Sequence, residues 1–141
     1  MKYFFDTSVL VAVSLAQHQH HERSLIAYLK ATPSNGACAA HTLAELYATV
    51  TRLPGNQRMS CEQALLFVDD VRGRLSIIAL NPEDYYSALL LAADENVTGG
   101  TVYDMLLAHC ARKVNAEIVY TWDFRDFARL GKDIAHRLRT P

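Results

Sequence analysis

Apolar residues along this chain form short runs that alternate with longer stretches of helical periodicity. The short runs are too brief for helices and predict buried strands at residues 2–5, 37–40, 75–80 and 117–121. The longer stretches predict helices at residues 8–16, 22–31, 42–53, 60–72, 82–95 and 101–113. Near the carboxyl end the pattern indicates a short helical turn at 124–130 and an edge strand around 134–136.

Capping residues support these boundaries. Ser60 and Gln63 have the spacing of a capping box, and Asn81-Pro82 is suited to begin a helix. Short apolar strands separated by helices are typical of an α/β fold with three layers. We therefore expect a mainly parallel central sheet of four or five strands flanked by helices. The chain has 141 residues and no internal repeat or linker, so we expect one domain covering residues 1–141.

Composition and charge narrow the classes of protein further. Half of the residues are hydrophobic and 21% are charged, which argues against a disordered chain. No apolar run approaches the ~20 residues of a membrane helix, and the first run reaches Asp6 too soon for a signal peptide. We therefore expect a cytoplasmic protein. Its net charge of −1 offers no general basic excess, so a nucleic-acid partner would need a local feature.

The cysteines indicate neither a disulfide framework nor a zinc site. There are three of them, they are widely spaced, and they include no CxxC pair. All lie in apolar or helical stretches. We interpret Cys38, Cys61 and Cys110 as buried thiols in a reducing compartment.

Acidic residues stand where an α/β sheet places its functional groups. Four of them follow predicted strands or lie in the first turn of predicted helices: Asp6, Glu45, Asp104 and Asp123. Asp126 lies three residues beyond the last of them. In an open parallel sheet, sites form beyond the carboxyl ends of the strands. We therefore expect these side chains to meet in one cleft.

Such a group of carboxylates indicates a divalent cation. The acids would repel one another at neutral pH, and this repulsion should raise their pKa values in the absence of metal. Mg²⁺ and Mn²⁺ prefer hard oxygen ligands, and Mg²⁺ also binds substrate phosphates. Two such ions about 3.5–4 Å apart can activate water and stabilise the leaving oxygen in phosphodiester hydrolysis.

A purely structural interpretation competes for two of the acids. Thr42 and Glu45 have the spacing of a capping box, and Thr101 and Asp104 form a weaker version of that pattern. An acid in the first turn of a helix also suits the helix dipole. Asp6 is harder to explain in this way, because an ionised acid after a wholly apolar strand is rarely left unpaired.

The acids belong to four ordered blocks that span nearly the whole chain. These are Phe4-Phe5-Asp6-Thr7-Ser8-Val9-Leu10, Thr42-Leu43-Ala44-Glu45-Leu46, Tyr103-Asp104-Met105-Leu106-Leu107-Ala108 and Thr121-Trp122-Asp123-Phe124-Arg125-Asp126-Phe127. In this order the chain resembles the PIN-domain ribonucleases, and more narrowly the VapC-like toxins of type II toxin–antitoxin pairs.

The resemblance implies a PIN-like fold and an endoribonuclease that hydrolyses RNA phosphodiester bonds with Mg²⁺ or Mn²⁺. It also implies a homodimer and a cognate antitoxin whose tail blocks the site. It assigns the catalytic and metal-binding acids to Asp6, Glu45, Asp104 and Asp123, with Asp126 as a further metal ligand. Supporting positions beside these acids are Thr7, Ser8 and Thr121.

Two other functions and two further features need an interpretation. A haloacid-dehalogenase-like phosphatase would need a second aspartate where Ser8 stands, and a non-catalytic module that binds RNA or protein would not need all four acids. The histidines at 18, 20 and 21 could bind zinc, but we interpret them as surface residues of a loop. The apolar stripe within residues 61–71 predicts a core face and a possible surface for dimerisation or antitoxin binding.

Overall fold

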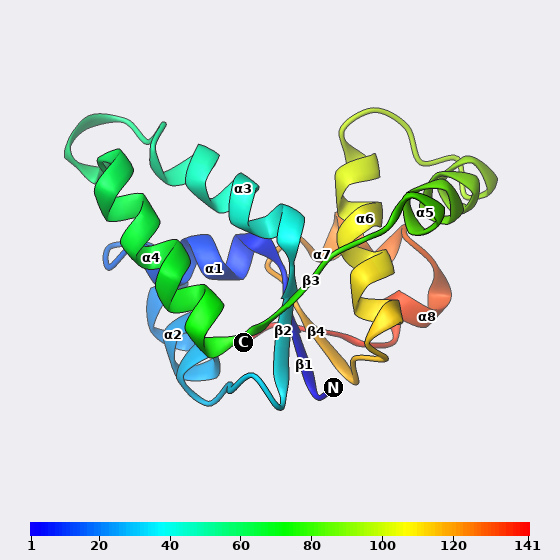
Figure 1. Cartoon of the computed structure of the whole chain (residues 1–141), viewed down its shortest axis with the longest axis horizontal. Coiled ribbons are helices and arrows are strands. Elements are labelled where there is room, and N and C mark those ends of the chain that lie inside the picture. Colours follow the sequence, from blue (N-terminus) through cyan, green and yellow to red (C-terminus); the bar gives the residue numbers. More distant parts are fainter.

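A parallel sheet of five strands forms the centre of the computed structural model, which describes all residues 1–141 (Figure 1). The strands are β1 (Tyr3–Phe5), β2 (Gly36–Ala39), β3 (Ser76–Ile78), β4 (Ile118–Tyr120) and β5 (Leu138–Arg139). They are arranged in the order β3-β2-β1-β4-β5, and every neighbouring pair is parallel. This confirms the predicted α/β fold with a mainly parallel sheet.

Helices cover both faces of the sheet and produce the three layers. One face carries α1 (Thr7–Ser14), α2 (His21–Leu29), α3 (Ala40–Val50) and α4 (Cys61–Arg74). The other face carries α5 (Pro82–Asp94), α6 (Thr101–Lys113), α7 (Phe124–Ala128) and α8 (Lys132–Ala135). A short 3₁₀ helix, Gly55–Gln57, lies between α3 and α4. No helix is both long and apolar enough to cross a bilayer.

Two neighbouring residues of β1 show how the sheet separates two hydrophobic cores. Phe4 and Phe5 are both fully buried, and successive side chains of a strand point to opposite faces. Phe4 belongs to the core formed with α5 to α8, and Phe5 belongs to the core formed with α1 to α4. The central strands β1, β2 and β4 therefore carry no charged residue, because both of their faces are covered.

The predicted caps are present at two helices. Ser60 and Gln63 form a reciprocal capping box at the start of α4. Asn81 caps α5 through the backbone N–H of Asp84, and Pro82 occupies the first turn. These local signals explain why the boundaries of both helices were predictable.

The carboxyl end differs from the prediction of an edge strand around residues 134–136. These residues lie in and just after the short helix α8, and the edge strand β5 begins only at Leu138. The run around Ile134 is apolar because Ile134 is buried in the core, not because it belongs to the sheet. Asp133 forms an ion pair with Arg112 (Nε–Oδ2, 2.8 Å), which holds the start of α8 against α6.

The prediction that the cysteines are buried is correct for two of the three residues. Cys38 and Cys110 are buried, and burial raises the pKa of each thiol to about 12. Cys61 is exposed, because it is the first residue of α4 and lies outside the packed face of that helix. The apolar character of the surrounding stretch was therefore misleading at its first position.

We predict opposite effects for two glycine substitutions. A Cβ on Gly36, at the start of β2, would lie 2.8 Å from Ala31 Cβ and 3.0 Å from Leu75 Cδ2. Gly36→Ala should therefore lower the free energy of unfolding by about 1–3 kcal/mol. Gly73→Ala in α4 meets no atom within 4 Å and should leave stability unchanged or raise it by up to about 1 kcal/mol. Urea denaturation measures both, and a Gly36→Ala protein as stable as the wild type would contradict the tight approach of these segments.

Candidate active site

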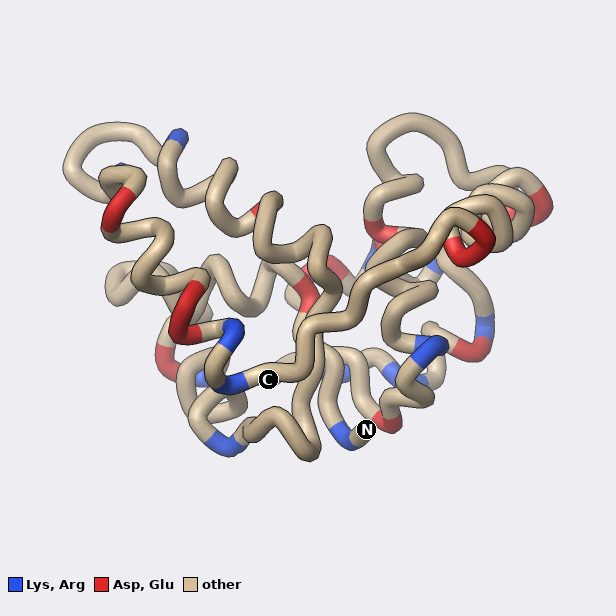
Figure 2. Tube along the Cα trace, viewed as in Figure 1, with Lys and Arg blue, Asp and Glu red and all other residues tan.

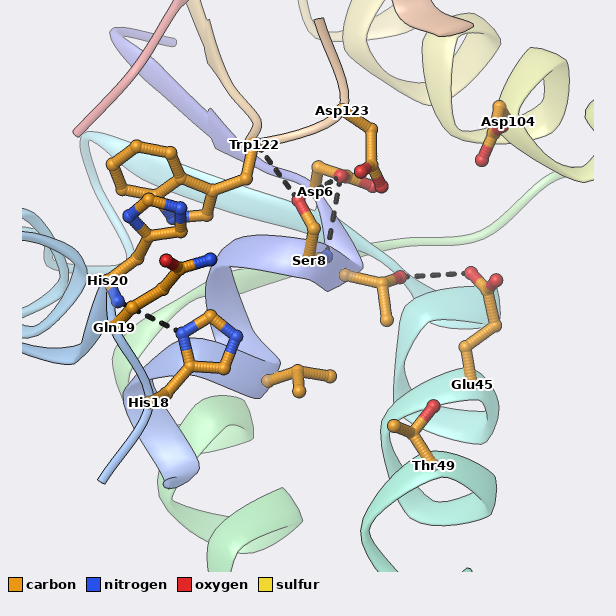
Figure 3. A pocket seen from close by; sticks show the side chains of 12 residues that line it. Asp6, Ser8, His18, Gln19, His20, Glu45, Thr49, Asp104, Trp122 and Asp123 are labelled. Carbon is orange, nitrogen blue, oxygen red and sulfur yellow. Dashed lines mark hydrogen bonds between the residues drawn. The ribbon is translucent and has the colours of Figure 1, made fainter. Parts of the chain in front are cut away.

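Strands β1 and β4 lie side by side at the centre of the sheet. From β1 the chain adds β2 and β3 on one side and β4 and β5 on the other, so the order of the strands reverses between β1 and β4. Open α/β sheets bind their ligands at such a switch point. Asp6 follows β1 and Asp123 follows β4, and the backbone N–H of Asp6 donates to the Tyr120 carbonyl (3.0 Å). Glu45 comes from α3 and Asp104 from α6. All four acids line one cavity of about 470 Å³ (Figure 3).

Asp6 is the most buried of these acids, with 3% of its surface exposed. It caps α1, and its Oδ2 accepts hydrogen bonds from Ser8 N (3.3 Å), Ser8 Oγ (2.6 Å) and Thr121 Oγ1 (2.9 Å). Burial raises the pKa of Asp6 to about 6, even though the hydroxyl groups of Ser8 and Thr121 favour the charged form. The nearby charge of Asp123 raises it further.

Two hydroxyl groups connect Asp6 to the segment that follows β4. Thr121 Oγ1 accepts a hydrogen bond from the backbone N–H of Asp123 (2.9 Å), and Ser8 Oγ accepts one from the backbone N–H of Trp122 (3.0 Å). Thr121 is fully buried. The first acid therefore sets the path of the backbone that carries Asp123, and Figure 3 shows the two carboxylates side by side.

Neither Glu45 nor Asp104 forms the capping box of the structural interpretation, although Asp104 does lie in the first turn of α6. Helix α3 begins at Ala40, which places Thr42 inside the helix, and Glu45 Oε1 instead accepts a hydrogen bond from Thr7 Oγ1 (2.9 Å). Helix α6 begins after Gly100 and has no side-chain cap. Both carboxylates instead face the cavity shared with Asp6.

Charge repulsion within the cavity is strongest at Asp104. Its pKa is raised to about 7, first by burial and then by the charges of Asp6, Glu45, Asp123 and Asp126. Partial burial and then the charge of Asp126 raise the pKa of Asp123. The predicted increase in pKa is therefore present at three of the four acids. The prediction was based on charge repulsion, but burial contributes more to the increase.

Asp126 is placed differently from the other acids. It is exposed on α7 and does not line the cavity, although its charge acts on Asp104 and Asp123. Thr7 and Ser8 line the cavity. Thr121 lies behind it, hydrogen-bonded to Asp6.

The opposite wall of the cavity holds residues that the sequence interpretation missed. His18, Gln19, His20 and Trp122 line it, and Figure 3 shows them across from Glu45 and Asp104. The description of His18 and His20 as surface residues of a loop is therefore incomplete. A signal was available in Trp122, because a large ring directly before Asp123 had to lie beside the acids.

The side chains around the cavity offer the ligands of a hard divalent cation. Every acidic donor is a carboxylate oxygen, with the hydroxyl groups of Thr7 and Ser8 beside them. Their placement is open, because no three His, Cys, Asp or Glu side chains lie close enough to hold one ion between them. This oxygen-donor chemistry fits Mg²⁺ or Mn²⁺.

The chain is similar to known proteins over most of its length. The PIN domain family matches residues 3–133. Ribonuclease VapC40 of Mycobacterium tuberculosis is 32% identical over 120 residues, which cover 85% of each chain. The crystal structure of M. tuberculosis VapC20, described as a Sarcin-Ricin loop cleaving toxin, superimposes with a TM-score of 0.74 at 16% identity, covering 90% of this chain and 94% of that one.

A second solved structure has the same fold over nearly the full length. It is VapBC2 from Rickettsia felis, bound to a DNA fragment from the promoter, with a TM-score of 0.65 and 22% identity. The match covers 99% of this chain and 98% of that one. The family match also excludes the haloacid-dehalogenase alternative. The chain belongs to the PIN domain family and, within it, to the VapC ribonucleases, as its four acidic blocks predicted.

Proposed function

We propose that this chain is a Mg²⁺- or Mn²⁺-dependent endoribonuclease and the toxin of a type II toxin–antitoxin pair, acting as one domain over residues 1–141. The observation that carries the proposal is the shared cavity, because four carboxylates from four separate segments line it at the switch point of the sheet. A scaffold that needed these acids only for stability would pair them with cations. Here none of the four pairs with a Lys or Arg, and the only imidazole within reach is that of His41, 3.9 Å from Glu45 (Nε2–Oε1).

Each acid has a distinct setting in the proposed mechanism. Asp6, Glu45, Asp104 and Asp123 would close on divalent ions from the open spacing that they have here, and these ions would activate a water and neutralise charge on the phosphate. Ser8 and Thr121 direct Asp6 by donating hydrogen bonds to Oδ2, and Thr7 directs Glu45 in the same way. Asp6 and Glu45 thus enter the reaction with their orientations already set by neighbouring hydroxyl groups.

Electrostatics makes the same metal necessary for RNA to bind. Figure 2 shows Asp and Glu at the centre of the molecule, and a group of Lys and Arg near the two termini and the amino ends of the strands. With a net charge of −1, the protein has no cationic excess to draw a polyanion towards the acids. Bound cations reverse the local sign at the cavity and allow the phosphate to approach.

Asp6→Asn should abolish most of the RNA cleavage while the fold survives. The substitution keeps the shape of the side chain but removes a charged ligand, so the loss should exceed the roughly 10–100-fold effect of changing a residue that only supports a ligand. Asp126→Asn should be milder, because Asp126 lies outside the cavity. The assay is cleavage of single-stranded RNA across a Mg²⁺ or Mn²⁺ titration, with EDTA as the control. Wild-type rates for Asp6→Asn at limiting metal would contradict the mechanism.

The stability of the metal-free protein should fall as the pH rises from about 4 to about 7. The pKa values of Asp6 and Asp104 are raised to about 6 and about 7 from 3.8, so the native state binds more protons than the unfolded state in this window. Asp104→Asn cannot lose that proton. The free energy of unfolding of Asp104→Asn, relative to that of the wild type, should therefore rise by roughly 2 kcal/mol across the window. This value is reduced for the partial exposure of Asp104.

Denaturation in EDTA between pH 4 and pH 8 measures this difference. Asp94→Asn removes a carboxylate from an exposed position of α5, outside the cavity, and serves as the control. Added Mg²⁺ should restore the stability of the wild type at high pH, because it stabilises the ionised acids. If the difference in free energy of unfolding between Asp104→Asn and the wild type stays constant across the window, ionisation of Asp104 does not destabilise the native state, and the prediction is wrong.

The proposed partners are RNA, a cognate antitoxin and a second copy of the chain in the cytoplasm. Exposed apolar side chains on α4 and α5 support an assembly, since Leu66 is 72% exposed and Tyr86 is 65% exposed. Light scattering at micromolar concentration without antitoxin should give twice the monomer mass of 15.8 kDa. Leu66→Glu should weaken the dimer if α4 lies in its interface. A monomer mass for the wild type would exclude the homodimer.

A further inference from the structure

The wall of the cavity opposite Glu45 and Asp104 contains two stacked rings (Figure 3). The imidazole of His20 lies flat on the indole of Trp122, with ring centroids 3.7 Å apart and an angle of 7° between the planes. The guanidinium of Arg23 lies 5.4 Å from the centroid of the indole ring. Metal binding by carboxylates needs none of these groups, so the stack requires a separate explanation.

The stack is held in place from several sides. Trp122 Nε1 donates to the hydroxyl of the buried Ser24 (2.9 Å), and the backbone N–H of Trp122 donates to Ser8 Oγ (3.0 Å). On the other side, a hydrogen bond between His21 Nδ1 and the Ala12 carbonyl (2.9 Å) joins the start of α2 to α1. Because Ser8 also donates to Asp6, the rings keep a fixed position relative to the proposed metal-binding acids.

The neighbouring His18 offers a directed hydrogen-bond donor. Its Nδ1 accepts a hydrogen bond from the backbone N–H of His20 (3.0 Å), so a neutral ring must carry its proton on Nε2. Burial, and then the proximity of His20 and His21, lowers the pKa of His18, which favours the neutral ring. His18 and the amide of Gln19 both line the cavity beside the stack.

We propose that the His20–Trp122 stack is a nucleobase subsite that seats the base of an unpaired nucleotide next to the cleaved phosphodiester, with His18 and Gln19 at its polar edge. The inference rests on the proposed ribonuclease function and specifies its substrate as RNA with an exposed base at the site. A nucleobase can stack on an aromatic side chain only when its nucleotide is unpaired and lies outside an RNA duplex. The fixed link through Ser8 would set the distance between that base and the acids.

Binding can be measured without catalysis, because Trp122 is the only tryptophan in the chain. AMP and UMP contain a base, a ribose and a phosphate but no phosphodiester bond, and ribose 5-phosphate is the matched compound without a base. In Mg²⁺, AMP and UMP should change the Trp122 emission saturably, and ribose 5-phosphate should not. Equal responses to all three compounds would overturn the base subsite.

The rate of RNA cleavage then tests whether the ring of His20 binds the base. The substrates are one single-stranded RNA and versions of it with one abasic nucleotide, moved in turn along the positions flanking the mapped cleavage site. We expect one position at which the wild type loses roughly five- to hundredfold in kcat/KM without the base, from the usual strength of base stacking. His20→Ala should remove most of that preference, His20→Phe should keep it, and Gln17→Ala, outside the cavity, is the control.

The outcomes separate this subsite from the proposed function. Cleavage without any base preference in the wild type, or a preference unchanged in His20→Ala, would overturn the assignment while leaving the nuclease intact. Tighter binding of AMP by His20→Ala would also overturn it, because the base would then compete with His20 for the indole. A protein that cleaves no RNA but shows the base-dependent emission change would refute the proposed nuclease and retain the subsite.

Discussion

The burial of one carboxylate between two strand ends organises both halves of the cavity. Asp6 is almost fully buried at the junction of β1 and β4, and it keeps its place by accepting hydrogen bonds from Ser8 and Thr121. The same two hydroxyl groups accept hydrogen bonds from the backbone of Trp122 and Asp123. A charged group in such a position is costly, and this burial raises the pKa of Asp6.

Much of the site was predictable because the carboxyl ends of parallel strands all lie at the same edge of the sheet. Apolar strands covered on both faces are recognisable as short runs, and a polar residue directly after such a run lies at the edge of the sheet. Asp6 and Asp123 were found in this way. Glu45 and Asp104 were ambiguous in sequence, because a helix cap and a ligand have the same spacing from the helix start. Only the contacts in the structure, such as that between Glu45 and Thr7, distinguish the two.

The other wall of the cavity could not be predicted from local patterns. His18 and His20 lie in a polar segment without periodicity, and Trp122 is about a hundred residues away in sequence. Their contact depends on how α1 and α2 pack beside β4. The same limit explains the error at the carboxyl end, where burial of Ile134 made the sequence apolar without making it a strand. A run of apolar residues predicts burial. It distinguishes a helix from a strand only when the run is long enough to show a period.

On the proposed function, protons and metal ions compete for the same oxygens. Asp6 and Asp104 have pKa values close to neutrality, so without a cation the cavity can relieve its repulsion by keeping protons. A divalent ion that binds must displace those protons, which links its affinity to pH. RNA in turn meets a cavity of reversed sign only after the ion is bound. The burial that positions Asp6 therefore also makes substrate binding conditional on the metal.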